Sequence, residues 1–144
     1  MPLLPTIQKS VLAALLLLLC LPGCIIVVDE EDEDDYFHRH RWRLDVIVYA
    51  GRTYAADEGY TITFQTDGNL IGRADCNSYD GLYETPRNGS LIIREIYSQD
   101  GNCGRQSLED RYFDVLSGAV TYRARNDELI ITARNGDNLY FYRD

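Results

Sequence analysis

Seven consecutive carboxylates at positions 29–35 divide this chain into two parts of different physical character. These side chains repel one another and offer no apolar surface to bury, so the run is expected to be extended and disordered. The chain has 144 residues, and setting aside the run and the apolar segment before it leaves roughly 100 residues for one modest core. A chain of this size excludes a multi-domain enzyme.

The segment before the acidic run is organised as an export signal. Lys9 is the one cation near the start, and an apolar stretch at 11–21 follows it. Residues 21–24, with the sequence LPGC, resemble the lipobox of bacterial lipoproteins, in which a signal peptidase cuts before a cysteine that is acylated. This resemblance implies that residues 1–23 are a signal peptide and that Cys24 carries the lipid.

An uncleaved anchor is the alternative, because residues 11–28 form an apolar run of 18 residues, just long enough to span a bilayer. In both cases Lys9 stays inside and the rest of the chain lies outside the cytoplasm. By resemblance to enterobacterial sorting, Ile25 after the cysteine favours the outer membrane. We therefore expect a protein of the bacterial cell envelope, anchored in the outer membrane by its acyl chains and facing the periplasm.

Two of the four cysteines, Cys76 and Cys103, lie beyond the signal and the lipid site. In an oxidising periplasm such a pair most often forms a disulfide, which here would stabilise the fold by roughly 3 to 4 kcal/mol. A buried free pair and a metal site remain alternatives. Zinc needs four ligands, however, and no histidine follows position 40, so we expect no metal or cofactor.

The charge balance restricts the possible partners. A formal net charge of −9 with a single lysine provides little of the basic surface that nucleic-acid binding requires. Calcium at the acidic run would need a loop that converges six or more oxygens, and no such turn pattern is visible there. The spacing of His38 and His40 would suit copper or nickel, but a basic strand start that partly neutralises the acidic run is the simpler interpretation.

Beyond the acidic run, short segments of alternating apolar and polar residues predict about eight β-strands. Tyr60, Ile62 and Phe64, for example, alternate with polar neighbours, and Asp67 with Gly68 predicts a tight turn after them. The predicted strands cover residues 44–50, 60–65, 70–76, 79–84, 91–97, 119–125, 128–134 and 138–143.

One segment, at about 107–117, has helical spacing instead. Ser107 can cap its first turn with Asp110 as capping-box partner, and Gly118 can end it. The apolar face that this helix would turn toward the sheet consists of Leu108, Tyr112, Val115 and Leu116. We therefore expect one helix that covers a sheet face or plugs the end of a barrel.

The order of several residues over positions 42–143 resembles the META domain (HslJ-like) of bacterial envelope proteins. Its most specific element is Cys76 and Asn77 followed by Tyr79 and Gly81. The other residues that carry the resemblance are Trp42, Leu44, Tyr60, Ile62, Phe64, Gly72, Tyr83, Cys103, Glu109, Phe113, Leu116, Leu129, Ile131, Leu139 and Phe141.

The resemblance implies an α+β fold, a mostly antiparallel sheet or partly closed barrel with one helix, over residues 42–144 and after a linker at 24–41. Family members have been linked to envelope stress, antibiotic tolerance and motility, and the family supplies no catalytic residues to transfer. Asp75 stands where the family usually has glycine, and the approach to the second cysteine at 98–103 is not threonine-rich. Locally, Asn77 can bond neighbouring backbone in a turn, and Gly81 can adopt a positive φ.

These features favour a non-enzymatic envelope lipoprotein that binds a protein or glycan of the envelope, or supports envelope integrity or stress tolerance. Eleven tyrosines and thirteen arginines fit a contact surface, although many tyrosines will simply pack the sheet. One alternative is a small-ligand or lipid carrier that uses the sheet interior, which a filled interior would oppose. A less favoured one is a glycan hydrolase that uses Asp75 and Asp80, which a separation beyond about 10 Å would oppose.

Overall fold

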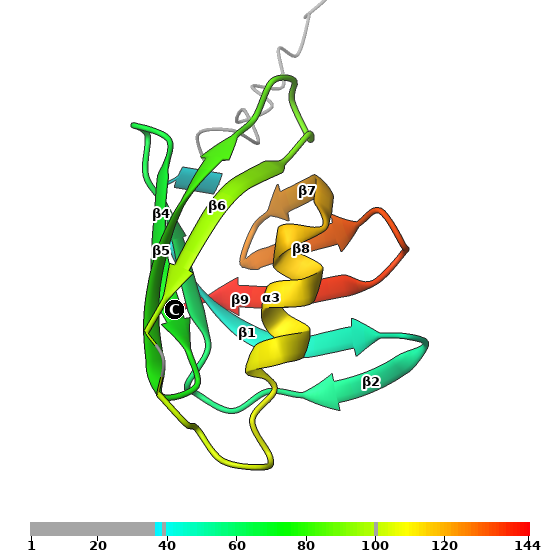
Figure 1. Ribbon diagram of the computed structural model, residues 1–144. Helices are drawn as coiled ribbons and strands as arrows, with labels where there is room; N and C mark the ends of the chain where they lie inside the picture. The colour runs from blue at the N-terminus through cyan, green and yellow to red at the C-terminus, as the bar shows by residue number, and fades with distance from the viewer. Residues whose placement is uncertain (1–36, 39, 100) are drawn as a thin grey trace, which may run out of the picture.

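The computed structural model describes residues 37–38, 40–99 and 101–144 (Figure 1). The expected signal peptide, the lipid site at Cys24 and the acidic run lie outside the described residues. Within the described ranges, no helix is both long enough and apolar enough to cross a membrane.

Nine strands form one antiparallel sheet in the order β6-β5-β4-β3-β1-β9-β8-β7, with β2 paired to β1 as a hairpin. Every pairing between neighbouring strands is antiparallel. The strands are β1 (Arg41–Tyr49), β2 (Arg52–Ala55), β3 (Thr61–Phe64), β4 (Asn69–Ala74), β5 (Asn77–Glu84), β6 (Ile92–Ser98), β7 (Ala119–Arg125), β8 (Glu128–Ala133) and β9 (Asn138–Arg143).

The sheet curls into a half-barrel, and the helix α3 (Glu109–Ser117) lies across its open side between β6 and β7 (Figure 1). The predicted α+β class, with a mostly antiparallel sheet and one helix, is therefore confirmed. Of the predicted helical face, Tyr112, Val115 and Leu116 are buried and Leu108 packs at the margin of the core.

The period-two alternation sends every second side chain into the half-barrel. In β5 the residues alternate between buried and exposed along the whole strand. Large side chains fill the space between sheet and helix. The largest of them, all less than 2% exposed or close to it, are Trp42, Tyr60, Tyr112, Phe37, Phe64, Leu44, Ile47 and Ile62.

Phe37 lies in the stretch that composition assigned to the linker, yet it is fully buried. Its ring stacks between Phe64 and Tyr122 with centroid distances of 4.0 and 4.2 Å, and its carbonyl oxygen accepts a bond from the Trp42 indole. Packing therefore begins before position 42, because an aromatic ring is needed to close this end of the half-barrel.

Strand β2 was not predicted from the sequence. Its turn consists of Ala50 and Gly51, both with positive φ (49° and 73°), and a side chain rarely occupies the first of these positions. The carboxylate of Asp137 accepts the N–H of Ala50 at 2.9 Å and holds the turn from outside the hairpin. A tertiary contact thus replaces the usual Asn-Gly turn signal.

The start of the helix differs from the prediction. Leu108 is the N-cap residue without a side-chain cap, and the Ser107 hydroxyl accepts the N–H of Glu109 instead of forming a capping box with Asp110. The helix ends at Ser117 with Gly118 as its C-cap, as predicted, although the φ of −84° at Gly118 is not left-handed. The position is close-packed instead, since a Cβ there would lie 3.4 Å from the Cβ of Ala133.

Candidate functional site

The predicted disulfide is present and ties the sheet to the loop before the helix. Cys76, in the β4–β5 turn, is bonded to Cys103, with a Cα–Cα distance of 5.4 Å. The N–H of Cys76 also lies 3.2 Å from the sulfur of Cys103. The path into α3 is therefore fixed covalently at one point.

Asn77 holds this disulfide loop against the helix. Its amide nitrogen donates to the Glu109 carboxylate at 2.8 Å and to the Gly101 carbonyl at 2.9 Å, while its oxygen accepts the Gly101 N–H at 2.9 Å. The expected bond to neighbouring turn backbone is thus replaced by bonds to a loop 24 residues away. A buried amide whose groups are all bonded fixes the sheet, the loop and the first helical turn together.

The hydroxyl of Tyr79 is part of a buried chain of hydrogen bonds, which we call the relay. Its hydroxyl donates to the Thr61 carbonyl at 2.9 Å and lies 2.5 Å from the hydroxyl of Tyr112 on α3. Because a phenol has one proton, Tyr112 must be the donor to Tyr79. Burial raises the pKa of both phenols above the ordinary value, so both remain protonated at neutral pH.

Gly81 does not have the positive φ expected from the sequence. It is needed for a close approach, because a Cβ there would collide with the carbonyl oxygen of Glu95 on β6. Gly72, which pairs with Tyr79 across β4 and β5, gives the Tyr79 ring its space in the same way. Asn77, Tyr79 and Gly81 are all buried, so the family motif specifies packing.

Asp75 explains why the family usually has glycine at this position. Its φ is 57°, the left-handed region that costs a side chain energy and that aspartate tolerates better than most residues. Glycine adopts this φ without strain, which is a physical reason for glycine at this position in the family.

The structure does not bring Asp75 and Asp80 together. Asp80 is exposed on the outside of β5, three residues from Asn77, which is roughly 10 Å of strand. Asp75 lies beyond Asn77 in the turn, so the backbone positions of the two residues are farther apart than the roughly 5 to 9.5 Å between paired glycosidase carboxylates.

The two histidines also face different partners. The Nδ1 atom of His38 lies 2.9 Å from the hydroxyl of Tyr83, and the His40 ring meets Trp42 edge-on at 5.9 Å. Both rings therefore pack around the Phe37 end of the half-barrel.

A larger feature that local motifs do not reveal lies on the outside of β1, β8 and β9. Val46, Tyr140 and Ile130 are direct cross-strand neighbours, and Val48 and Tyr142 extend the row. We call these five residues the outer aromatic face. They line a shallow hollow of about 440 Å³, and Tyr142 is 40% exposed.

The alternation in β9 places Tyr140 and Tyr142 on the side opposite Leu139 and Phe141, as the sequence indicated. What the sequence did not indicate is which strands flank β9. Strand β9 pairs with β1, which lies about a hundred residues earlier in the chain, and no local pattern encodes such a pairing.

Comparisons with known proteins agree on the fold. The structure is similar to the NMR structure of a protein from Burkholderia xenovorans, with a TM-score of 0.65, 21% identity, and coverage of 76% of this chain and 85% of that one. It is also similar to the crystal structure of a DUF4847 family protein from Bacteroides vulgatus, with a TM-score of 0.58, 14% identity, and coverage of 77% and 96%. No curated protein matches the sequence.

The family profile of the META domain matches residues 35–144, which includes the buried Phe37 and every strand and helix described above. Because this match covers most of the sequence, the chain belongs to the META domain family.

Proposed function

We propose that this protein is a non-enzymatic lipoprotein of the bacterial envelope that binds another envelope component through its outer aromatic face. The observation that carries the proposal is the contiguity of that face. Tyr140 lies directly between Val46 and Ile130 in the register, so apolar side chains from three strands form one uninterrupted stripe. The stripe is partly exposed, and contiguous apolar surface that solvent can reach is typical of interaction sites.

The exposed apolar side chains elsewhere on the sheet lack this continuity. Ile71 is 44% exposed, but its neighbours across the strands are Thr63 and Asp80. Leu82 is flanked by polar and charged residues in the same manner. Scattered residues of this type are normal on a soluble surface, which favours the outer aromatic face as the contact.

Charged groups at the margin of the outer aromatic face fit a specific contact. Arg43 lies opposite Tyr142 in the register, with its guanidinium carbon 6.0 Å from the ring centroid. Asp45 and Glu128 also line the hollow. An apolar centre with a charged rim is the usual arrangement of a protein interface.

The filled interior supports surface binding over the carrier hypothesis. Trp42, Phe64 and Tyr112 occupy the space between sheet and helix where an enclosed ligand would sit. The separation of Asp75 and Asp80 likewise gives the hydrolase hypothesis no support.

Anchoring is part of the proposal. Acylation of Cys24 would place the Phe37 end of the domain within about 45 Å of the membrane, which is the reach of the intervening chain. The expected result is incorporation of labelled palmitate into the wild-type protein and none into the Cys24→Ala variant, with the labelled protein in the outer-membrane fraction. Labelling that is equal in both proteins would reject the lipid site.

Photo-crosslinking in living cells tests the binding face. A photoreactive phenylalanine analogue replaces Ile130 or Tyr142 in the full chain, and the matched controls carry it at Leu82 or Ile71. We expect adducts of defined mass, identified by mass spectrometry, only from the first pair. Equal adducts from all four positions, or none from any of them, would contradict a specific contact, and an adduct with a second copy would identify the face as a homodimer interface.

A further inference from the structure

The two edge strands of the half-barrel meet over a short seam and then separate. The N–H of Leu91 donates to the Val120 carbonyl at 3.1 Å, and the N–H of Tyr122 donates to the Gly89 carbonyl at 2.9 Å. Beyond these bonds β6 and β7 diverge, and α3 ends beside the gap (Figure 1). A register shift between Ala119 and Thr121 interrupts β7 at the same place, as a bulge at a sheet edge does.

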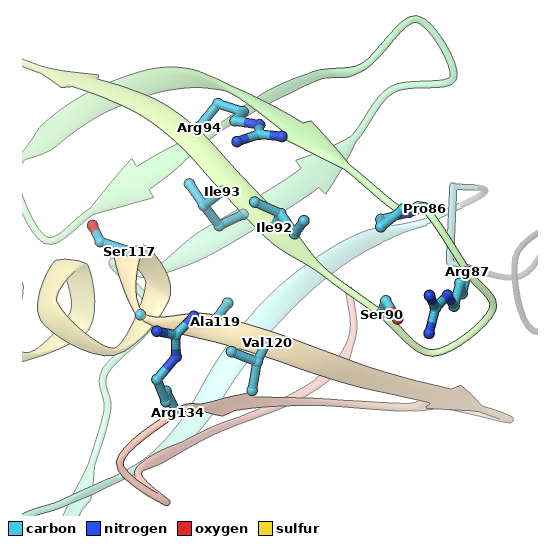
Figure 2. Close-up of a pocket in the computed structure, with 11 residues that line it drawn as sticks. Pro86, Arg87, Ser90, Ile92, Ile93, Arg94, Ser117, Ala119, Val120 and Arg134 are labelled. Carbon is cyan, nitrogen blue, oxygen red and sulfur yellow. The ribbon is translucent and has the colours of Figure 1, made fainter.

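The divergence leaves a cleft of about 830 Å³, which we call the seam cleft. Its floor is apolar, formed by Ile92 and Ile93 from β6 and by Ala119 and Val120 from β7 (Figure 2). Its volume lies within the usual range of small-molecule sites, about 300 to 1,000 Å³.

The charged residues that line the seam cleft are all arginines. Figure 2 shows Arg87 at one end, in the β5–β6 loop, and Arg134 at the other, beside the end of the helix. Arg94 is bound to Glu84 through two bonds of 3.0 and 2.8 Å. Within the described part of the chain, the side chains of Arg87 and Arg134 have no hydrogen-bond or ion-pair partner.

A structural role explains the position of Arg134 but not that of Arg87. Arg134 lies near the C-terminal end of α3, whose partial negative charge favours a cation. Arg87 has no helix end beside it, and an exposed arginine by itself is unremarkable. The combination is more specific, because two guanidinium groups with no partner among the described residues line one apolar hollow in a protein whose net charge is −9.

We propose that the seam cleft binds a single-chain amphiphile as a single molecule outside the bilayer, with its anionic head, a phosphate or a carboxylate, paired with the arginine at one end and its chain on the apolar floor. Guanidinium groups match such heads in charge and geometry, and the apolar floor accepts the chain. This ligand site is separate from the outer aromatic face and does not depend on the proposed function.

Photoaffinity labelling of the full chain in isolated membranes tests the site. The probe is an alkyl phosphate with a diazirine in its chain, and the matched control has the same chain with a trimethylammonium head. We expect the phosphate probe to label peptides that contain Ile92, Ile93 or Val120, with at least tenfold less labelling by the cationic probe. Labelling that is equal for both heads, or that lies elsewhere in the chain, overturns the proposal.

Variants and competitors complete the test. The double change Arg87→Ala and Arg134→Ala is expected to lower labelling about tenfold or more, whereas Arg105→Ala, an exposed arginine outside the cleft, leaves it unchanged. Free dodecyl phosphate should displace the probe, and vesicles of phosphatidylglycerol should not. Equal displacement by the vesicles would identify a bilayer headgroup as the ligand, and unchanged labelling of the double variant would show that the arginines hold no anion.

Discussion

The phenol pair of Tyr79 and Tyr112 shows how single residues join the helix to the sheet. Both rings are buried, and the two hydroxyls lie 2.5 Å apart with a further bond to the Thr61 carbonyl. Each hydroxyl has only the other, or this carbonyl, to replace its lost water. The pair therefore acts as one polar unit inside an apolar core.

The relay predicts unequal effects of removing each hydroxyl. Tyr79→Phe leaves the Tyr112 hydroxyl without its acceptor and removes the bond to the Thr61 carbonyl, so we expect it to lower the free energy of unfolding by about 1 to 3 kcal/mol. Tyr112→Phe removes one bond and leaves the Thr61 bond intact, at a cost of about 0.5 to 1.5 kcal/mol. Urea unfolding of both variants and the double variant measures this, and strictly additive effects would contradict the relay.

The left-handed backbone at Asp75 allows a second test at the residue scale. Asp75→Gly removes the side-chain strain at a φ of 57° and is expected to leave stability unchanged or slightly raised. Asp75→Val places a β-branched residue there and should destabilise the protein by about 1 to 2 kcal/mol. Thermal unfolding distinguishes them, and equal melting temperatures for the two variants would remove the conformational explanation of the family glycine.

At the scale of elements, the sequence predicts the features that depend on local patterns and misses those that depend on distant contacts. The strands at 119–125 and 138–143 were predicted at their observed bounds, because alternation and turn residues act over a few positions. The hairpin at Ala50 and Gly51 was missed, since its support comes from Asp137. The seam cleft was missed too, because Arg87 and Arg134 come to line one cleft only when the sheet closes.

The contribution of Phe37 belongs to this scale, because one ring closes an end of the half-barrel that the strands leave open. Phe37→Ala removes a fully buried ring stacked on Phe64 and Tyr122, and should lower the free energy of unfolding by about 3 to 5 kcal/mol. The matched control is Tyr97→Ala, because Tyr97 is 61% exposed and its loss should change stability by less than about 0.5 kcal/mol. Equal effects in denaturant unfolding would place Phe37 outside the folding unit.

The whole molecule combines a domain of nearly balanced charge with a concentrated acidic run. The seven carboxylates at 29–35 account for most of the net charge of −9. Both proposed binding surfaces lie on the outside of the domain, one across β1, β8 and β9 and the other at the seam of β6 and β7. A domain with a filled interior can therefore present two independent contacts.

The buried phenols also set how the whole fold responds to alkali. Burial raises the pKa of Tyr79 and Tyr112 above the ordinary value of 10.0, while in the unfolded chain both titrate near 10. The contribution of the two phenols to the free energy of unfolding is complete below pH 10. It is lost as the pH rises toward the folded-state pKa, because only the unfolded state releases these protons. Each phenol should lower the free energy of unfolding by about 1.4 kcal/mol per pH unit above pH 10.

Urea unfolding between pH 8 and 11.5, followed by the fluorescence of Trp42, measures this slope. We expect a flat profile up to about pH 10 and then a fall of nearly 3 kcal/mol per unit for the two phenols together. The double variant Tyr79→Phe with Tyr112→Phe starts from lower stability but should lose the part of the slope that these two phenols supply, and the remainder belongs to groups such as Tyr60, whose pKa burial also raises. A double variant as steep as the wild type would assign the alkaline transition to other groups, because the readout is the slope and not the initial stability.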